Sequence, residues 1–568
     1  MSSSGKSTSS AGSRRPLDPI TRTALRYTIS PREYELLHQY LISRAPKQLQ
    51  QRTPNPPRYE KITESRTEGG EYNANAMRTS LRVFITIFLG FKSWEGVKKA
   101  LAARKGAAPA AAVTVAGAPT STAVAVRHPN ARIALAFSSI LLFHRLLFRF
   151  FKRLRASLLE ANAEPFRKRN PGVTRALTSP YTPAIGASLA GFLLGVSPSD
   201  QLRLTIVIYI LSRSLEFGYN ALADGGYLWS EESGRPWWFG SWLIMPFACG
   251  QLLHAFVFDR DCFPESYGRF ILARSPEYIQ LRPAGFPKDG AWPGTFDIVD
   301  ALADCAKLKW PAFVSPILFP SLKETLPALA VAPALHKVKP IIAPAFPGAT
   351  HLSCALLHPH DPSCARTYLR YWIAAFPSVA KFFTIVYGAF ALLAYKSLLK
   401  TPGPFLNKLS ARILRMTVFI TGSIGTSWAS ICLFNNYLPR NTLPTQRFFL
   451  GGFLGGLWAF VASNGERSTF LYSARTTIES TYRVGKKHGW WTGVPNGDVL
   501  VFVAALALTS AVHEARPTAV NSGVFRKLLS SMNGEGWVDR AAAPAPEKKA
   551  VEGSDDASAA VGKGEKQA

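Results

Sequence analysis

The densest group of residues that could do chemistry is a Cys/His segment in the second half of the chain. His351, Cys354, His358, His360 and Cys364 lie within fourteen residues, and thiolates and imidazoles are the ligands that Zn²⁺ prefers. The spacing C-x3-H-x-H-x3-C is not a standard zinc-finger spacing, and two prolines stiffen it. A structural cap at a membrane surface is therefore the favoured interpretation of Cys354, His358 and Cys364. A metal site and a Cys354–Cys364 disulfide are the alternatives.

No other pattern predicts a catalytic site. His254 and Asp259 have the H-x4-D spacing of glycerolipid acyltransferases, but the neighbouring residues of that signature are missing. The segment 186–190 approximates a nucleophile elbow, yet no strand precedes it, and helix packing explains its small residues. We therefore expect a protein that is not an enzyme, with no catalytic residue, no cofactor and no bound metal.

Charged residues on otherwise apolar helices form a second candidate site. Such charges are costly in hydrocarbon and usually face a partner or a wet cavity. The functional hypothesis is a polar groove for a substrate segment, a lipid headgroup or an ion, and the alternative is a set of amphipathic interface helices with solvated charges. The residues are Arg203, Arg213, Glu216, Arg467, Arg475 and Glu479.

Long apolar windows would have to position these residues. Windows at 176–199, 236–258, 416–439 and 448–465 carry no charge, and each has about the 18 to 24 residues that cross a bilayer as a helix. A further span at 371–395 contains only Lys381 as a charge. With 47% hydrophobic residues in the whole chain, these windows predict an integral membrane protein.

The charge and cysteine patterns agree with that interpretation. The net charge is +30, and the Lys and Arg residues cluster beside the apolar windows and do not form one basic domain. This pattern is typical of topology and lipid-headgroup charges, so we expect no nucleic acid partner. Six cysteines without a disulfide framework favour a cytosol-facing or organellar protein over a secreted one.

The two halves of the chain share an order of features. Y-I-L-S-R-S-L-E at 209–216 matches Y-S-A-R-T-T-I-E at 472–479 in its Tyr, in its Glu and in having an Arg between them. Upstream in each half lies a Gly-rich span, and small residues at a spacing of four allow two helix backbones to approach closely. This order predicts an internal duplication. The helix-packing glycines are Gly191, Gly195, Gly451, Gly452, Gly455 and Gly456.

The pattern C-x3-H-P-x3-S-C at 354–364, followed by a span, a Gly-rich span and an Arg/Glu helix, resembles the transmembrane protein 135 family, particularly its fungal members. That family is in turn distantly similar to mitochondrial inner-membrane import translocase subunits. The resemblance covers 354–512, and it extends to 132–278 through the repeat. It implies a multi-pass protein of peroxisomes or mitochondria that is associated with organelle dynamics and lipid handling, without an established catalytic activity.

Together these features predict an all-α polytopic membrane protein, built from two repeated glycine-packed helical bundles with disordered termini. The expected parts are a polar, largely disordered arm (1–80), an interfacial helix and Ala-rich linker (81–130), a first membrane repeat (131–258), a Pro-rich extramembrane loop (259–353), the Cys/His motif with a second membrane repeat (354–515) and a disordered tail (516–568).

The expected function is non-enzymatic and concerns peroxisomal or mitochondrial membrane homeostasis or lipid handling. The expected partners are the lipid bilayer and other organelle-membrane proteins. A transporter or translocase-like channel that uses the Arg/Glu helices is the alternative, and a lipid acyltransferase is a distant third.

Overall fold

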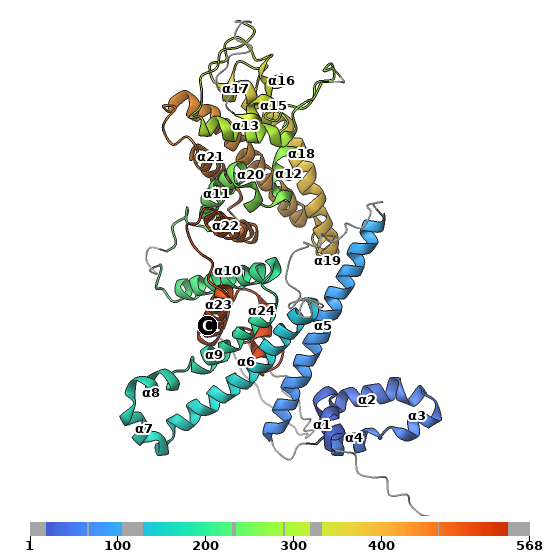
Figure 1. Ribbon diagram of the computed structural model, residues 1–568. Coiled ribbons are helices and arrows are strands. Elements are labelled where there is room, and N and C mark those ends of the chain that lie inside the picture. The colour runs from blue at the N-terminus through green and yellow to red at the C-terminus, as the bar shows by residue number, and fades with distance from the viewer. Residues whose placement is uncertain are drawn as a thin grey trace, which may run out of the picture. The chain divides into compact units, whose positions relative to one another are not determined.

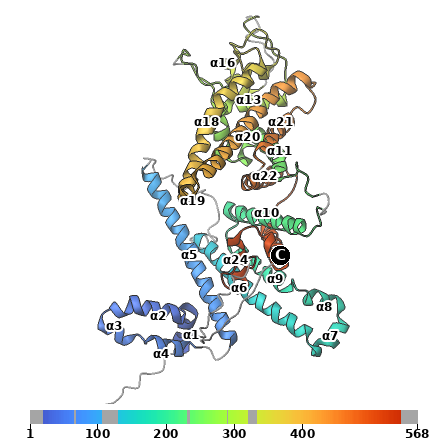
Figure 2. The same ribbon diagram turned by 180° about the vertical axis from the view of Figure 1, so that it is seen from behind.

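The protein is helical throughout its described part. The computed structural model describes residues 19–64, 68–104, 129–229, 234–287, 290–318, 332–463 and 465–542. These residues form helices and no strand, apart from an isolated bridge between Ala312 and His351. The prediction of an all-α chain is confirmed for these residues (Figure 1 and Figure 2).

Five helices in the described part are long and apolar enough to cross a membrane. This finding supports the prediction of an integral membrane protein, because each helix combines sufficient length with few charges. The five are α6 (Pro129–Leu159), η4 with α11 (Ser241–Phe258), α18 (Cys364–Leu393), α20 (Pro402–Tyr437) and α23 (Gly497–Ala515).

The two Gly-rich windows differ from the prediction, since they form shorter apolar helices, Thr182–Val196 and Arg447–Ala462. Each begins as an α-helix and continues as a 3₁₀-helix. The 3₁₀ parts rise about 2.0 Å per residue against about 1.5 Å in an α-helix, so these elements are longer than their residue counts suggest. The elements are α9 (Thr182–Ala187), η3 (Ser188–Val196), α21 (Arg447–Gly456) and η7 (Leu457–Ala462).

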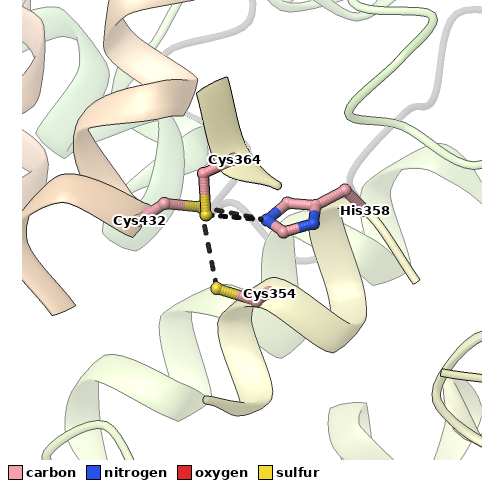
Figure 3. A group of neighbouring side chains, drawn as sticks. All are labelled: Cys354, His358, Cys364 and Cys432. Carbon is pink, nitrogen blue, oxygen red and sulfur yellow. Dashed lines mark hydrogen bonds between the residues drawn. The ribbon is translucent and has the colours of Figure 1, made fainter. Parts of the chain in front are cut away.

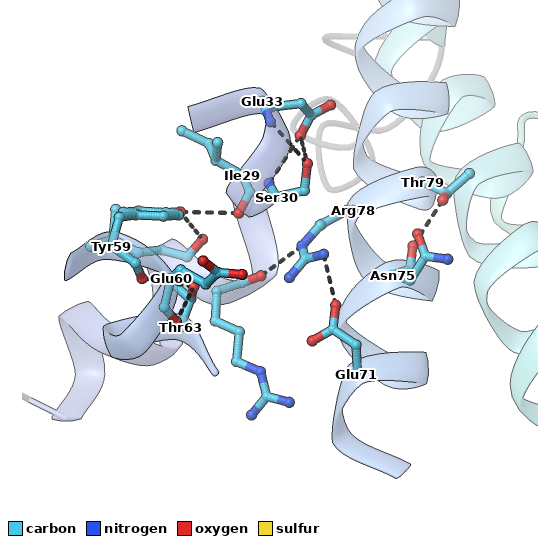
Figure 4. A network of polar contacts seen from close by, with 12 residues as sticks. Ile29, Ser30, Glu33, Tyr59, Glu60, Thr63, Glu71, Asn75, Arg78 and Thr79 are labelled. Carbon is cyan, nitrogen blue, oxygen red and sulfur yellow. Dashed lines mark hydrogen bonds and ion pairs between the residues drawn. The ribbon is translucent and has the colours of Figure 1, made fainter. Parts of the chain in front are cut away.

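The prediction of a largely disordered arm over 1–80 is wrong for its described part, which contains short helices joined by a small aromatic core. Ser30 and Glu33 form a capping box at the start of α2, and the Tyr34 ring stacks on Tyr59 with centroids 3.8 Å apart. The Tyr59 hydroxyl donates a hydrogen bond to the Ile29 carbonyl at 3.0 Å (Figure 4). These contacts offset the entropy that a polar segment loses on ordering. The helices are α1 (Pro19–Thr28), α2 (Pro31–Tyr40), η1 (Ile42–Arg44), α3 (Lys47–Arg52) and α4 (Pro56–Thr63).

The expected interfacial helix is part of a longer helix, α5 (Glu68–Arg104). Arg78 ties α5 to the short helices, because its Nε donates to the Arg26 carbonyl at 2.8 Å while its Nη1 pairs with Glu71 at 3.1 Å (Figure 4). Residues 1–18 and the predicted Ala-rich linker at 105–128 lie outside the described residues.

The predicted disordered tail is also partly wrong. Helix α24 (Gly523–Met532) buries Leu529 in a cluster that includes Phe217 and Val512. The Arg145 guanidinium of α6 donates to the Ser531 carbonyl at 2.9 Å. These apolar and polar contacts order the segment up to residue 542, and residues 543–568 lie outside the described part.

The described helices fall into two compact units that do not coincide with the predicted repeats. The first unit contains 1–198, 214–224 and 503–568, and the second contains 199–213 and 225–502. Helix α11, expected in the first repeat, therefore belongs to the second unit, where it packs against α21 and α22 (Arg467–Lys487). Most of α23, expected in the second repeat, belongs to the first unit.

The position of α11 follows from the glycines of α21. Gly452 and Gly456 face α11, while Gly451 and Gly455 face α20. A Cβ at Gly456 would lie 2.6 Å from the Met245 carbonyl oxygen, so only glycine permits this approach. In the first Gly-rich element, Gly191 is buried and Gly195 is exposed.

The Pro-rich segment at 259–353 is folded in its described part. Its helices α12 (Glu265–Ala273), α13 (Thr295–Lys307), α15 (Pro333–Lys337), α16 (Lys339–Ile342) and α17 (Leu352–Leu357) pack into one apolar cluster with α11, α18 and α20. The Trp428 indole of α20 donates to Ser275 Oγ at 2.8 Å. The segment therefore shares a core with the long apolar helices.

We predict that Gly456→Ala lowers the thermal stability of the purified protein, because the new methyl group meets backbone atoms of Met245 and Pro246 that cannot move aside. Overpacking of this kind typically costs about 1–3 kcal/mol. Gly388→Ala is the matched control, since nothing lies within 4 Å of its Cβ position. A melting curve in which Gly456→Ala is as stable as Gly388→Ala would contradict the packing described above.

Candidate metal centre

Four buried or half-buried side chains of the second unit bring their ligand atoms together. The Sγ atoms of Cys354, Cys364 and Cys432 and a ring nitrogen of His358 all lie within 4.8 Å of one another (Figure 3). His358 Nε2 is 3.4 Å from Cys364 Sγ and 3.5 Å from Cys432 Sγ, and the Sγ atoms of Cys354 and Cys432 are 3.9 Å apart. In a tetrahedral zinc site with ordinary bond lengths, neighbouring sulfur atoms are about 3.8 Å apart and sulfur and nitrogen about 3.6 Å. These three distances are close to those of a tetrahedral Cys3His site, and the remaining ligand atoms lie within 4.8 Å of one another.

Three segments position these ligands. Cys354 lies on α17, and His358 ends this helix by donating its backbone N–H to the Cys354 carbonyl at 2.9 Å. Cys364 is the first residue of α18, whose start is capped by the hydroxyl of Ser363. Cys432 comes from α20. The turn between α17 and α18 places three ligands on one side, and α20 supplies the fourth.

A hydrogen bond fixes the orientation of the imidazole. His358 Nδ1 donates to the Asp361 carbonyl at 2.8 Å, so Nε2 is the nitrogen that faces the sulfur atoms. Metal-bound histidines almost always hold their second nitrogen in this way. The Asp361 carboxylate is held in turn by the backbone N–H of Ser363 at 3.1 Å and by Arg370 at 3.3 Å.

The site is largely buried from solvent. Cys354, His358 and Cys432 are each at most 5% exposed, and the Phe346 ring stacks beside the imidazole. Burial alone would lower the pKa of His358, but hydrogen bonds to the Cys354 and Cys364 sulfurs raise this pKa to about 10. Without a metal, the imidazole therefore keeps a second proton beside the sulfurs, and a metal would have to displace it.

A buried polar network lies next to the site. The guanidinium of Arg447, which is fully buried, donates to Asn435 Oδ1 at 2.6 Å and to the Thr442 carbonyl at 3.1 Å. Asn435 donates to Ser353 Oγ at 2.6 Å. Because Ser353 adjoins Cys354 and Asn435 lies near Cys432 on α20, this network fixes α17 and α20 relative to each other.

Three of the five predicted Cys/His candidates belong to the cluster, and two do not. The structure brings Cys354, His358 and Cys364 together, whereas the hydroxyl of Thr350, not the cluster, bonds the ring of His351 at 3.0 Å, and His360 is not part of the cluster. The alternative of a Cys354–Cys364 disulfide is wrong, since all six cysteines are free.

Cys432 was missed by the sequence analysis. It stands alone in the charge-free window at 416–439, and no spacing rule links it to the other three ligands. The only available signal was an isolated cysteine in a helix that follows the Cys/His segment.

The six charged residues of the predicted polar groove have several separate partners. Arg203 is buried and pairs with Asp498 at 2.6 Å. The Arg475 guanidinium donates to Ser212 Oγ at 2.6 Å and lies 4.5 Å from the centre of the Tyr209 ring. These contacts lie within the second unit and tie α10 (Gln201–Asp224) to the helices that follow it in that unit.

The remaining members behave similarly. Glu216, in the first unit, accepts a hydrogen bond from Asn521 at 2.8 Å. Glu479 pairs with Arg483 one turn further along α22, at 2.8 Å. Arg213 lies over the Tyr209 ring, and Arg467 is the first residue of α22. These contacts show that several of the charges take part in local packing and ion pairing, and the polar groove stays a prediction.

The acyltransferase-like pair also has a structural explanation. The buried Asp259 carboxylate pairs with Lys487 at 3.0 Å and with His488 at 3.1 Å. The ring of His254 packs against Phe258. Asp259 therefore links the end of α11 to the end of α22.

The comparisons with known proteins add no assignment: no family model, no curated protein and no solved structure matches this chain. The resemblance to the transmembrane protein 135 family stays a prediction from the sequence. The function is therefore argued from the site and from the helices that carry it.

Proposed function

We propose that this chain is a non-catalytic integral membrane protein whose second unit is stabilised by Zn²⁺ bound to Cys354, His358, Cys364 and Cys432. The observation that carries the proposal is the convergence of these four ligand atoms within 4.8 Å in a buried site. Protein atoms would occupy all four tetrahedral positions. Catalytic zinc sites keep one position for water or substrate, whereas structural sites are closed.

The ligand chemistry favours zinc. Thiolates select soft or borderline metals, and a tetrahedral site with three sulfurs and one nitrogen suits Zn²⁺ better than Mg²⁺ or Ca²⁺, which prefer oxygen. Bound Zn²⁺ would also offset two of the three negative charges of the thiolates, which are costly to bury alone. The metal would hold the α17–α18 turn to α20 and thereby stabilise the folded 259–353 segment.

The proposed setting is a membrane. Five described helices have the required length and hydropathy, and α18 exposes large apolar side chains such as Ile373, Ile385 and Leu393. Lipid would cover these side chains without a further protein partner. From the family resemblance, we propose peroxisomal or mitochondrial membrane homeostasis or lipid handling as the role, with the bilayer and other organelle-membrane proteins as partners.

Two fractionation measurements test the membrane setting and the organelle. We expect the protein to co-fractionate with peroxisomal or mitochondrial markers and to stay in the membrane pellet after alkaline carbonate extraction. Recovery in the soluble fraction would contradict the membrane setting.

An internal repeat is part of the proposal. Both Gly-rich elements pass from α-helix to 3₁₀-helix, and both precede a helix that carries Arg and Glu, α10 in one half and α22 in the other. This shared order supports a duplication of glycine-packed bundles. In such a duplication, α11 and α23 are the corresponding last spans of the two halves. Helix α11 lies in the second compact unit and most of α23 in the first, so each contributes to the unit built mainly by the other half.

A transporter is the second candidate function. The ion pair of buried Arg203 with Asp498, the second residue of the candidate span α23, favours it, because ionisable residues on membrane-spanning helices often mark a transport path. Glu216 accepts a hydrogen bond from Asn521 and Glu479 pairs with Arg483, so both side chains also have structural contacts. A lipid acyltransferase is the weakest candidate, since the Asp259 carboxylate already pairs with Lys487 and His488.

We predict that Cys432→Ser abolishes stoichiometric zinc in the purified full-length protein and lowers its melting temperature, because one of four ligands is lost. Metal content is measured by mass spectrometry of the element, with the melting curve recorded on the same sample. Cys305→Ser is the matched control, since Cys305 is fully buried and lies outside the cluster. The proposal fails if the wild-type protein carries no zinc, or if both variants keep it equally.

We predict that zinc affinity falls as the pH falls. The thiols and His358 must lose protons to bind the metal, and the raised pKa of His358 means that the proton on this ring still competes at neutral pH. The apparent affinity should fall by about tenfold per pH unit for each proton released. Competition with a chromophoric chelator over a pH series measures this slope, and an affinity independent of pH would contradict ligation by thiolates and imidazole.

A further inference from the structure

A large apolar cavity lies in the second unit, apart from the metal ligands. Its volume is about 440 Å³, within the range of roughly 300–1,000 Å³ that is typical of ligand pockets. The walls come from α11, α12, α18, α20 and α22, and the cavity is partly open to its surroundings. Apolar lining residues include Leu252, Phe263, Phe270, Phe382, Phe419 and Ile420.

The hydroxyl groups of the wall are largely satisfied by neighbouring protein atoms. Ser427 Oγ donates to the Ser423 carbonyl within α20 at 2.7 Å. Thr469 Oγ1 donates to Glu466 at 3.0 Å, and Glu466 itself is paired with Arg412. The wall therefore suits an alkyl chain better than a polar solute or a hydrated ion.

One cation beside the cavity lacks an acidic partner. The Arg274 guanidinium lies 4.9 Å from the ring centre of Phe270 and 5.5 Å from that of Phe382, and both rings line the cavity. Its Nε atom is buried without a hydrogen-bond partner, and among the described residues Arg274 makes no ion pair. Arg274 is half-buried, and a buried guanidinium N–H that lacks a hydrogen-bond acceptor is costly, so this position favours an anionic ligand.

We propose that this cavity binds the acyl chain of an anionic single-chain lipid, with the head group at Arg274. The shared chemistry is one alkyl chain joined to an oxyanion that accepts two hydrogen bonds from a guanidinium. The head group is the carboxylate of a fatty acid or the phosphate of a lysophosphatidic acid. The inference rests on the proposed membrane setting, where such lipids are available, and it does not depend on the metal centre.

Photo-crosslinking of the full-length protein in nanodiscs tests the proposal. Three probes carry a diazirine on the same alkyl chain: a fatty acid, a lysophosphatidic acid and a zwitterionic lysophosphatidylcholine. Peptide mapping by mass spectrometry locates the crosslinks. We expect the anionic probes to label residues of the cavity wall, and the zwitterionic probe to label them weakly.

The variants separate head-group recognition from folding. Arg274→Gln should weaken labelling by the anionic probes by about tenfold, because a charge-assisted pair is lost, and Arg274→Lys should restore part of it. Arg269→Gln is the matched control on α12, since Arg269 is exposed and pairs with Glu265. Ser266→Trp, at an exposed position that lines the cavity, should narrow the entrance and reduce labelling by every probe.

The probes also identify the head group. Labelling by the fatty acid alone supports a carboxylate, labelling by the lysophosphatidic acid alone supports a phosphate, and labelling by both supports an oxyanion site without further selectivity. Equal labelling by the zwitterionic probe, no effect of Arg274→Gln, or no crosslink in the wall would overturn the proposal. Zinc content and carbonate extraction are measured on the same preparation, so a failure here is distinguished from a failure of the proposed function.

Discussion

Three thiols and an imidazole lie together in a largely buried site of the second unit, where uncompensated charge is costly. Three sulfur atoms within 4.8 Å of one another cannot all ionise without a compensating cation, and neutral thiols bind their neighbours only weakly. The raised pKa of His358 has the same origin, because the neighbouring sulfurs favour the protonated form of the imidazole. The proposed Zn²⁺ would offset most of this charge with one ion, and the closed ligand set would make that ion a structural element.

The proposed metal centre depends on how closely the surrounding helices approach one another. The glycines of α21 let it contact α11 and α20 almost backbone to backbone. Arg447, also on α21, reaches α17 through Asn435 of α20. The same helices α11 and α20 then form two walls of the apolar cavity. Close packing of small residues therefore positions both the proposed metal centre and the cavity, although these small residues are not ligands themselves.

Much of the architecture could be predicted from the sequence, because length and hydropathy are local properties. The windows at 236–258 and 416–439 and the span at 371–395 correspond to three of the five long apolar helices, whereas the windows at 176–199 and 448–465 form the two shorter ones. Cys354, His358 and Cys364 were named as one motif because they lie close in the sequence, with a metal site only as an alternative. Cys432 was not part of this motif, since 68 positions separate it from Cys364 and only tertiary packing brings the two together. The sequence also did not predict that α11 lies in the second compact unit and most of α23 in the first, because this too depends on tertiary packing. The ordered parts of both termini depend on side-chain contacts, such as the Tyr34–Tyr59 stack, that composition does not reveal.

The most direct test of the central claim is X-ray absorption at the zinc edge, recorded on the full-length protein purified without added metal. The account predicts a four-coordinate zinc with three sulfur neighbours at about 2.3 Å and one nitrogen at about 2.0–2.1 Å. A protein without zinc, or a zinc shell made only of nitrogen and oxygen, would contradict it.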